Sequence, residues 1–297
     1  MTDSDPTPSK PAKPRKWRRR LRRGVLGLLA VVGLFALASC IHLDRANPAY
    51  PATNAEVDDA IEAMKDDPVG LDRPVVVLSG WRSPSLTGRS LAGRIRKVTG
   101  AGEGRVTSIS YTWQAGIPEI AATVAQKVAD EYGTTTDPAT GQRWTTEVDV
   151  VAISMGGLVA RTAWAEPAAV GRDPGVRLNI KTLYTLGSPH RGAKLATWIR
   201  LDESARQMKP GSDFLADLDA ATLGGAHDLR IVPYATLRDS WVGATNAAPH
   251  GQEPIWVPGR IVLSHHLISL DDRILADLGR RLRGEAPLAE PSAPPRD

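Results

Sequence analysis

The chain alternates short apolar runs with segments of helical character. Pro74 to Leu78 is continuously apolar, as expected for a strand that is buried on both faces of a parallel sheet. Further strands are predicted at residues 106–110, 148–153, 180–186 and 229–236. The segments between and after them predict helices at 85–98, 118–132, 156–164 and 271–282. This order of strands and helices predicts an α/β protein with a mostly parallel central sheet and helices on both faces.

A further helix is predicted before this region. Thr53 and Glu56 have the spacing of a capping box, in which both side chains satisfy backbone amides of the first turn. Val57, Ile61 and Met64 then recur at helical spacing. We therefore divide the chain into four parts. They are a leader at 1–40, a linker with this short helix at 41–70, the α/β domain at 71–283 and a disordered tail rich in Pro and Ala at 284–297.

The leader has the pattern of an export signal. A basic stretch at 18–23 precedes an apolar run at 24–39, whose 16 residues fall short of the roughly 20 that a membrane-spanning helix needs. The run ends in Leu37-Ala38-Ser39-Cys40, which resembles the bacterial lipobox and implies lipid attachment at Cys40. The alternative is an uncleaved apolar anchor. Both interpretations place the body outside the cytoplasm, attached to a membrane of the cell envelope.

Positive charge is concentrated in this leader. The whole chain has a net charge of +4, but residues 40–297 carry 28 basic and 31 acidic side chains, a net charge of −3. A nucleic-acid-binding domain needs basic residues clustered on its folded surface, so we do not expect nucleic acid to be a partner. The apolar fraction of 42% is ordinary for a globular protein with a full core.

The strongest local signal for chemistry is Ala152-Ile153-Ser154-Met155-Gly156. It lies between a predicted buried strand and a predicted helix, at the carboxyl end of the strand, where such sheets bind their ligands. A sharp turn at this place lifts the serine hydroxyl out of the sheet and needs small residues two positions before and after it, as Ala152 and Gly156 are. We therefore predict that Ser154 is a nucleophile.

A serine hydroxyl needs a base to remove its proton, and imidazole is suited to neutral pH. In this architecture an acid and then a histidine follow the serine along the chain. That order favours His265 or His266 over the earlier histidines. Asp239 follows the strand predicted at 229–236, so we expect its carboxylate to orient the imidazole, the alternative being a surface turn.

Two backbone amides are predicted to stabilise negative charge on a substrate carbonyl oxygen. One is the amide of Met155, directly after the nucleophile. The other belongs to Trp81 in the loop after the first strand, where Gly80 permits a close backbone approach.

These segments resemble the lipase and esterase branch of the α/β-hydrolases, and the resemblance spans about residues 72–282. Ser79-Gly80-Trp81 resembles the His-Gly-aromatic oxyanion segment of that family, and residues 152–157 resemble its Gly-His-Ser-Met-Gly-Gly turn. Residues 185–192, Thr-Leu-Gly-Ser-Pro-His-Arg-Gly, are close to the bacterial lipase segment Thr-Leu-Gly-Thr-Pro-His-Arg-Gly. The departures are Ser79, Ala152 and Ile153.

The end of the chain carries the same resemblance. His265, followed by Asp271, Arg273 and Ile274, fits the closing pattern of the family, and this spacing is the reason to prefer His265 over its neighbour as the base. By the same resemblance His190 supports the site and is not the base.

The resemblance implies a carboxylic ester hydrolase of the lipase or esterase type, acting on a small-molecule ester or a lipid without a metal or organic cofactor. Thioesterase and acyltransferase chemistry would use the same residues. About 40 residues between the fourth and fifth strands could cover the site as a helical cap, or could pack as a helix pair. The three departures motivate an alternative, a membrane-tethered pseudo-hydrolase that binds an apolar ligand or partner without turnover.

Overall fold

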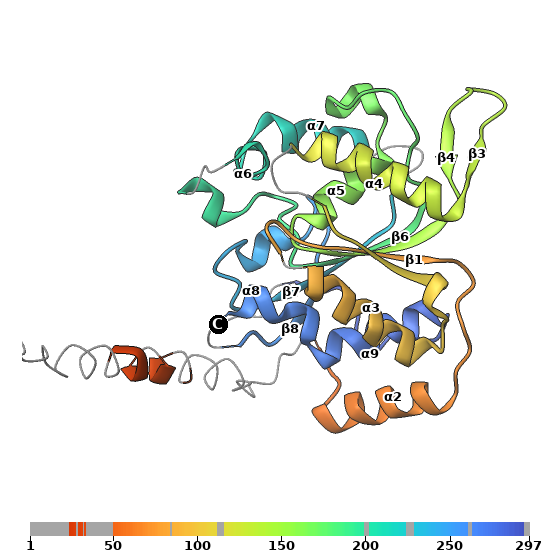
Figure 1. Ribbon diagram of the computed structural model, residues 1–297. Coiled ribbons are helices and arrows are strands. Elements are labelled where there is room, and N and C mark those ends of the chain that lie inside the picture. The colour runs from red at the N-terminus through yellow and green to blue at the C-terminus, as the bar shows by residue number, and fades with distance from the viewer. Residues whose placement is uncertain are drawn as a thin grey trace, which may run out of the picture.

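The computed structural model describes residues 50–83, 85–111, 116–198, 202–223, 229–260 and 263–293, with 24–27, 29–31 and 33 of the leader. Six parallel strands form one sheet in the order β2-β1-β5-β6-β7-β8 (Figure 1). They are β1 (Val75–Leu78), β2 (Val106–Ile109), β5 (Val148–Ile153), β6 (Ile180–Leu186), β7 (Ile231–Thr236) and β8 (Ile255–Val257). A separate antiparallel hairpin pairs β3 (Thr134–Thr136) with β4 (Arg143–Thr145).

The five strands predicted from the sequence are confirmed, each within two residues of its predicted bounds. The hairpin and β8 were not predicted. Each of these strands has only three residues, and so short a segment does not establish a period of two that sequence analysis can detect.

The sheet has a hydrophobic core on each face. Along β1, Val76 and Leu78 pack into one core with α4 and α5, whereas Val75 and Val77 pack into the other with α2, α3 and α9. Because helices cover both faces, every side chain of β1 is buried, which explains its continuous apolar run. The helices are α2 (Asn54–Asp66), α3 (Ser85–Thr99), α4 (Ile117–Tyr132), α5 (Gly156–Trp164), α7 (Asp213–Thr222) and α9 (Asp272–Leu282). Figure 1 shows α4, α5 and α7 on one side of the sheet and α2, α3 and α9 on the other.

The helix predicted before the α/β domain is part of the folded body. The capping box of Thr53 and Glu56 is present at the start of α2. Val57, Ile61 and Met64 are buried in the same core as α3 and α9, so the body includes α2, which begins 17 residues before the predicted boundary at residue 71. Cys40 lies outside the described residues. Among the described residues, no helix has the length and apolar character that a membrane crossing would require.

The prediction of a disordered tail at 284–297 is wrong for residues 284–293. The buried carboxylate of Asp277 accepts hydrogen bonds from the amides of Leu288 at 2.7 Å and Ala289 at 3.1 Å. The indole of Trp256 donates to the carbonyl of Ser292 at 2.8 Å. Composition alone suggested disorder, but the side chains of Asp277 and Trp256 fix the backbone of this segment.

Candidate active site

Ser154 stands in a strained turn between β5 and α5. Its φ angle is +53°, a value that a residue with a Cβ rarely adopts and that often marks a functional site. Its amide donates to the carbonyl of Leu186 on the neighbouring strand at 2.9 Å, which fixes the turn to the sheet. Gly156 is required here because a Cβ on it would lie 2.8 Å from the carbonyl oxygen of Ser79. Ala152, by contrast, is fully buried in the core, where its methyl group is accommodated.

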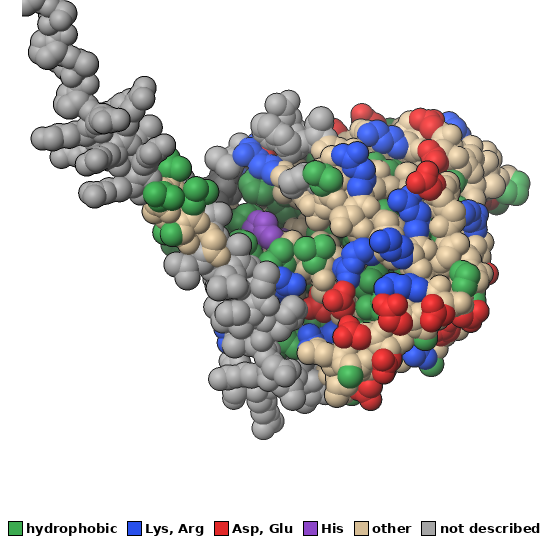
Figure 2. Space-filling view, turned by 60° about the horizontal axis from the view of Figure 1, so that its bottom comes forward, with side chains coloured by type: hydrophobic (Ala, Val, Ile, Leu, Met, Phe, Trp, Pro, Cys, Tyr) green, Lys and Arg blue, Asp and Glu red, His purple; other side chains and the backbone are tan. Residues whose placement is uncertain are grey.

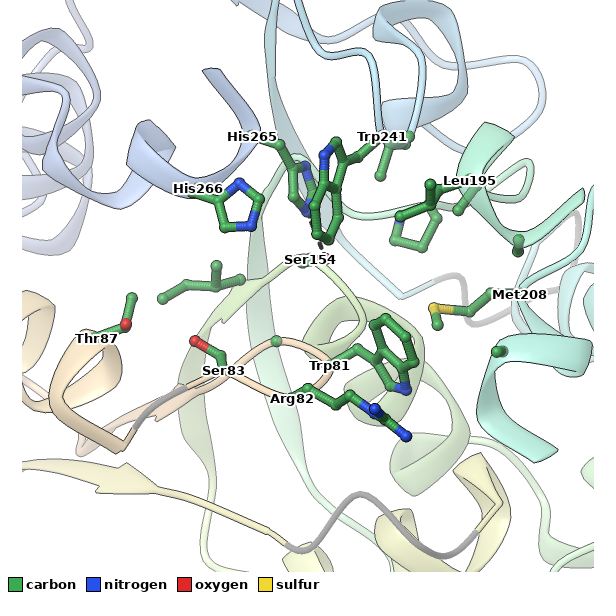
Figure 3. Close-up of a pocket in the computed structure, with 17 residues that line it drawn as sticks. Trp81, Arg82, Ser83, Thr87, Ser154, Leu195, Met208, Trp241, His265 and His266 are labelled. Atoms are coloured by element: carbon green, nitrogen blue, oxygen red, sulfur yellow. Dashed lines mark hydrogen bonds between the residues drawn. The ribbon is translucent and has the colours of Figure 1, made fainter. Parts of the chain in front are cut away.

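Asp239, His265 and Ser154 form a continuous chain of hydrogen bonds. Nδ1 of His265 donates to Oδ2 of Asp239 at 2.7 Å. Because a carboxylate can only accept, Nδ1 carries the proton and Nε2 presents its lone pair to Oγ of Ser154, 2.9 Å away (Figure 3). The other carboxylate oxygen, Oδ1 of Asp239, accepts from the amides of Trp241 and Val242 at 3.0 and 2.9 Å. These amides fix the carboxylate, which in turn fixes the imidazole ring.

The three residues come from separate parts of the chain. Ser154 follows β5, Asp239 lies in the loop after β7, and His265 is on the short helix α8 (Ser264–Leu267). All three strands β5, β6 and β7 run in the same direction, so their carboxyl ends meet at one edge of the sheet. Asp239 and His265 are both buried, at 5% and 8% exposed, whereas Ser154 is partly exposed.

The adjacent histidine has a different place. The ring of His266 packs edge-on against Trp241 with ring centroids 4.2 Å apart, and it lines the cavity beside Ser154. Burial, and then the neighbouring His265, lower the pKa of His266. The side chain of His266 is exposed to solvent, while the edge of its ring packs against Trp241. His250 pairs with Asp219 on α7, and His227 lies outside the described residues.

The loop after β1, which begins at Ser79, approaches Ser154 closely. A Cβ on Gly80 would lie 3.0 Å from Cβ of Ser154, so only glycine fits without displacing the turn. The hydroxyl of Tyr111 donates to the carbonyl of Ser79 and holds the start of this loop. Among the described residues, no backbone carbonyl accepts a hydrogen bond from the amide of Trp81 or of Met155. The two amides predicted as oxyanion donors thus have no backbone acceptor in the described part of the chain. They lie on either side of Ser154, in segments that are in contact.

The departure at Ser79 concerns the packing beneath this loop. Its side chain is buried against Gly88 of α3, where a Cβ on the glycine would lie 2.8 Å from the serine hydroxyl. Ser79 is not among the residues that line the cavity beside Ser154. The side chain of Ser79 is thus separated from the cavity at Ser154.

A cavity of about 630 Å³ opens at Ser154. Its walls are mainly apolar, and they consist of residues 80–83, Thr87, Ile153, Ser154, Pro189, Ala193, Leu195, Ala196, Ala205, Met208, Trp241, Val242, His265 and His266. In Figure 3, Trp81, Leu195 and Met208 lie on one side of Ser154, and Ser83, Thr87 and His266 lie on the other. Figure 2 shows a histidine side chain in a hollow bordered by hydrophobic side chains, apart from most of the charged residues of that face.

The insertion between β6 and β7 both lines this cavity and packs against the core. Its first part, with η3 (Lys194–Thr197) and α6 (Glu203–Gln207), contributes the wall residues Leu195, Ala196, Ala205 and Met208. Its second part, α7, buries Leu215 and Leu218 in the core that contains α5. The first half of the insertion therefore lines the cavity, and the second half packs against the core.

His190 belongs to a buried polar network next to the site. Its Nδ1 accepts from the Arg161 guanidinium at 3.3 Å, so Nε2 carries the proton and donates to Thr185 on β6 at 3.0 Å. Arg161, on α5, is fully buried and bonds Asp219 at 2.5 Å and Thr222 at 2.6 Å, both on α7. Burial, and then the charge of Arg161, hold the pKa of His190 well below its usual 6.5. This network joins α5, the helix that follows Ser154, to α7 of the insertion.

Comparison with solved structures identifies the fold. The mature lipase BlEst2 of Bacillus licheniformis is similar with a TM-score of 0.54 and 16% identity, covering 73% of this chain and 94% of that one. The lin2722 product of Listeria innocua has a TM-score of 0.48 and 12% identity, covering 70% and 92%. Phospholipase PlaB of Legionella pneumophila has a TM-score of 0.43 and 17% identity, covering 56% and 38%. No protein-family model and no curated protein sequence matches the chain. The likeness to BlEst2 shows the α/β-hydrolase fold that the sequence motifs implied.

The buried His190 predicts a pH dependence of stability. Because its pKa is lowered in the folded state, the unfolded chain takes up a proton below about pH 6.5 and the folded chain does not. Well below pH 6.5 this residue therefore favours unfolding by about 1.4 kcal/mol per pH unit as the pH falls. Because the imidazole of the unfolded chain is already half protonated near pH 6.5, we expect wild type to lose about 1 kcal/mol more unfolding free energy than His190→Gln between pH 6.5 and 5.5, measured by urea denaturation. Equal pH dependences in the two proteins would contradict this assignment.

Proposed function

We propose that this protein is a serine hydrolase that cleaves a carboxylic ester through an acyl-enzyme on Ser154. The observation that supports it best is the hydrogen-bonded series of Asp239, His265 and Ser154 at 2.7 and 2.9 Å, beside an apolar cavity. These distances are within the reach that a base and its nucleophile need. In this proposal Ser154 is the nucleophile, His265 the general base and Asp239 the orienting acid.

The reaction follows from the protonation states of the hydrogen bonds. Nε2 of His265 takes the proton of Ser154 as Oγ attacks the ester carbonyl carbon, and the amides of Trp81 and Met155 donate to the resulting oxyanion. The imidazolium, stabilised by Asp239, then gives its proton to the leaving alkoxide, and an acyl-serine and a free alcohol result. Water deprotonated by His265 attacks the acyl-serine, and the acid leaves as Ser154 regains its proton.

The lining of the cavity favours an apolar acyl group. Trp81, Leu195 and Met208 form one side of the space next to Ser154, and an acyl chain there would leave water for an apolar wall. A structural neighbour that shares the fold is named a lipase, which agrees with such a substrate. We therefore propose an ester or lipid with an apolar acyl chain as the substrate.

The first test is covalent labelling by a fluorophosphonate, which reacts with an activated serine. We expect the wild type to be labelled, and Ser154→Ala and His265→Asn to lose labelling and about 10⁶-fold in kcat. His266→Asn, the matched control, is expected to keep its labelling rate within about tenfold, because His266 does not bond Ser154. A folded wild-type protein that stays unlabelled would favour the non-catalytic, ligand-binding alternative. Labelling that survives Ser154→Ala would contradict the proposed nucleophile.

The second test concerns the acyl chain. Each methylene that moves from water into the cavity is worth about 0.8 kcal/mol, so kcat/KM should rise about fourfold per methylene along p-nitrophenyl esters from acetate until the wall is covered. Leu195→Asn is expected to flatten this increase, and Leu195→Met, of similar volume, is expected to preserve it. Rates should be measured below the concentration at which the esters form micelles. A kcat/KM that falls from acetate onward would contradict an apolar acyl group.

We further propose that the leader attaches the protein to a membrane outside the cytoplasm through a lipid on Cys40. The support is the sequence alone, namely the basic stretch, the short apolar run and the Leu-Ala-Ser-Cys end. Mass spectrometry of the mature protein should find an N-terminus at Cys40 with the mass of a diacylglycerol added. In Cys40→Ser this modification should be absent. An intact N-terminus that still includes the apolar run would support the uncleaved anchor instead.

A further inference from the structure

Asp202 connects the insertion to the oxyanion loop. It lies at the N-terminus of α6, and Oδ1 accepts the amide of Ala205 at 2.9 Å, which caps the helix. Both carboxylate oxygens also accept from the indole Nε1 of Trp81, at 3.2 and 3.0 Å. The guanidinium of Arg82 approaches Oδ2 at 3.5 Å. The side chain of Asp202 is only 9% exposed.

The contact with Asp202 holds the Trp81 side chain of the loop after β1. At its start, Tyr111 holds the carbonyl of Ser79, and Gly80 lies against Ser154. After Trp81 the chain turns through Arg82, whose φ angle of +51° is unfavourable for a residue with a Cβ. The guanidinium of Arg82 stacks over the Trp81 ring with its central carbon 4.9 Å from the centroid. The indole is therefore held between Arg82 and Asp202.

The orientation of the Trp81 side chain constrains its backbone. An indole ring that is tethered at Nε1 and covered by Arg82 restricts the rotation of the residue about its own backbone bonds. The amide of that residue is one of the two donors proposed for the oxyanion. Such a donor is effective only when it points at the developing charge, and a misplacement of 1 Å can cost about a hundredfold in rate.

We propose that Asp202 is a positioning residue for the oxyanion hole, which orients the Trp81 amide through the indole. The assignment rests on the proposed function. It makes the insertion part of the catalytic arrangement as well as the wall of the cavity, since one carboxylate starts α6 and holds the oxyanion loop. Asp202 itself does not touch the substrate.

The competing explanation is that Asp202 only caps α6. Cap and tether are separated most cleanly from the indole side, because Oδ1 accepts from both Ala205 and Trp81, and the carbonyl of an asparagine can keep both bonds. Asp202→Asn keeps the cap, removes the acceptor at Oδ2 together with the negative charge, and so weakens the tether without breaking it. Trp81→Phe removes the indole donor from the other side and keeps the backbone amide and an aromatic wall. The two variants together form a double-mutant cycle.

We expect Trp81→Phe to lower kcat about ten- to a hundredfold, and Asp202→Asn, which keeps one acceptor, to lower it less, with KM within about twofold of wild type in both. The double variant should be no slower than Trp81→Phe alone, because both changes act on the same contact. Affinity for an aryl trifluoromethyl ketone, whose serine adduct carries an oxyanion, should fall by the same factor as kcat/KM. Glu203→Gln, a change at the next carboxylate of α6, which is exposed and pairs with Arg206, is the matched control and should behave as wild type.

Two results would overturn this assignment while leaving the proposed function intact. One is an active wild type whose kcat is unchanged in Trp81→Phe, because that variant removes the indole donor and leaves the Asp202 cap of α6 in place. The other is multiplicative losses in the double variant, which would mean that Trp81 and Asp202 act independently. A wild type that is neither labelled by a fluorophosphonate nor able to turn over any ester would overturn the proposed function and this assignment with it.

Discussion

The geometry of the site depends on the close contact between the end of β1 and the start of α5. Two glycines make it possible. A Cβ on Gly156 would strike the carbonyl of Ser79, and a Cβ on Gly80 would crowd Ser154. Because neither glycine has a side chain, the loop after β1 lies directly against the turn at Ser154, and the strained φ of Ser154 is held by a hydrogen bond from its amide to β6. Protein interiors resist deformation because they are close-packed, so a contact between backbones fixes both segments.

The sequence predicted the local parts of this arrangement. The buried run of β5, the small residues around Ser154 and the helix that follows are all adjacent along the chain, and their pattern is sufficient to place the turn. Asp239 could be proposed because it follows a recognisable strand. The choice between His265 and His266 could not be made from periodicity, because neighbouring residues share an element and differ only in direction. The hydrogen bonds of His265 to Ser154 and Asp239 show which ring faces the serine.

The features that the sequence did not reveal depend on side-chain hydrogen bonds. The buried carboxylate of Asp277 in α9 accepts from the amides of residues 288 and 289 and from Tyr234, and Trp256 donates to Ser292 in the same tail. Asp202 and Trp81 are 121 positions apart, and the sequence of neither segment predicts their contact. A hydrogen bond between side chains leaves no periodic trace, whereas burial of a helix face or a strand does.

The insertion is attached in two ways that differ in strength. Its second half, α7, is fixed to α5 by Arg161, a fully buried guanidinium whose loss of partners would leave an uncompensated charge in the interior. Its first half contacts the loop after β1 through Asp202, whose side chain is 9% exposed, and forms part of the apolar wall. Substitutions in η3 or α6 can therefore change the shape of the cavity while α5 and the turn at Ser154 stay in place. Because the same half holds the loop after β1, however, a change of wall shape that moves Asp202 also moves Trp81, so under the proposed function acyl specificity and turnover would be coupled.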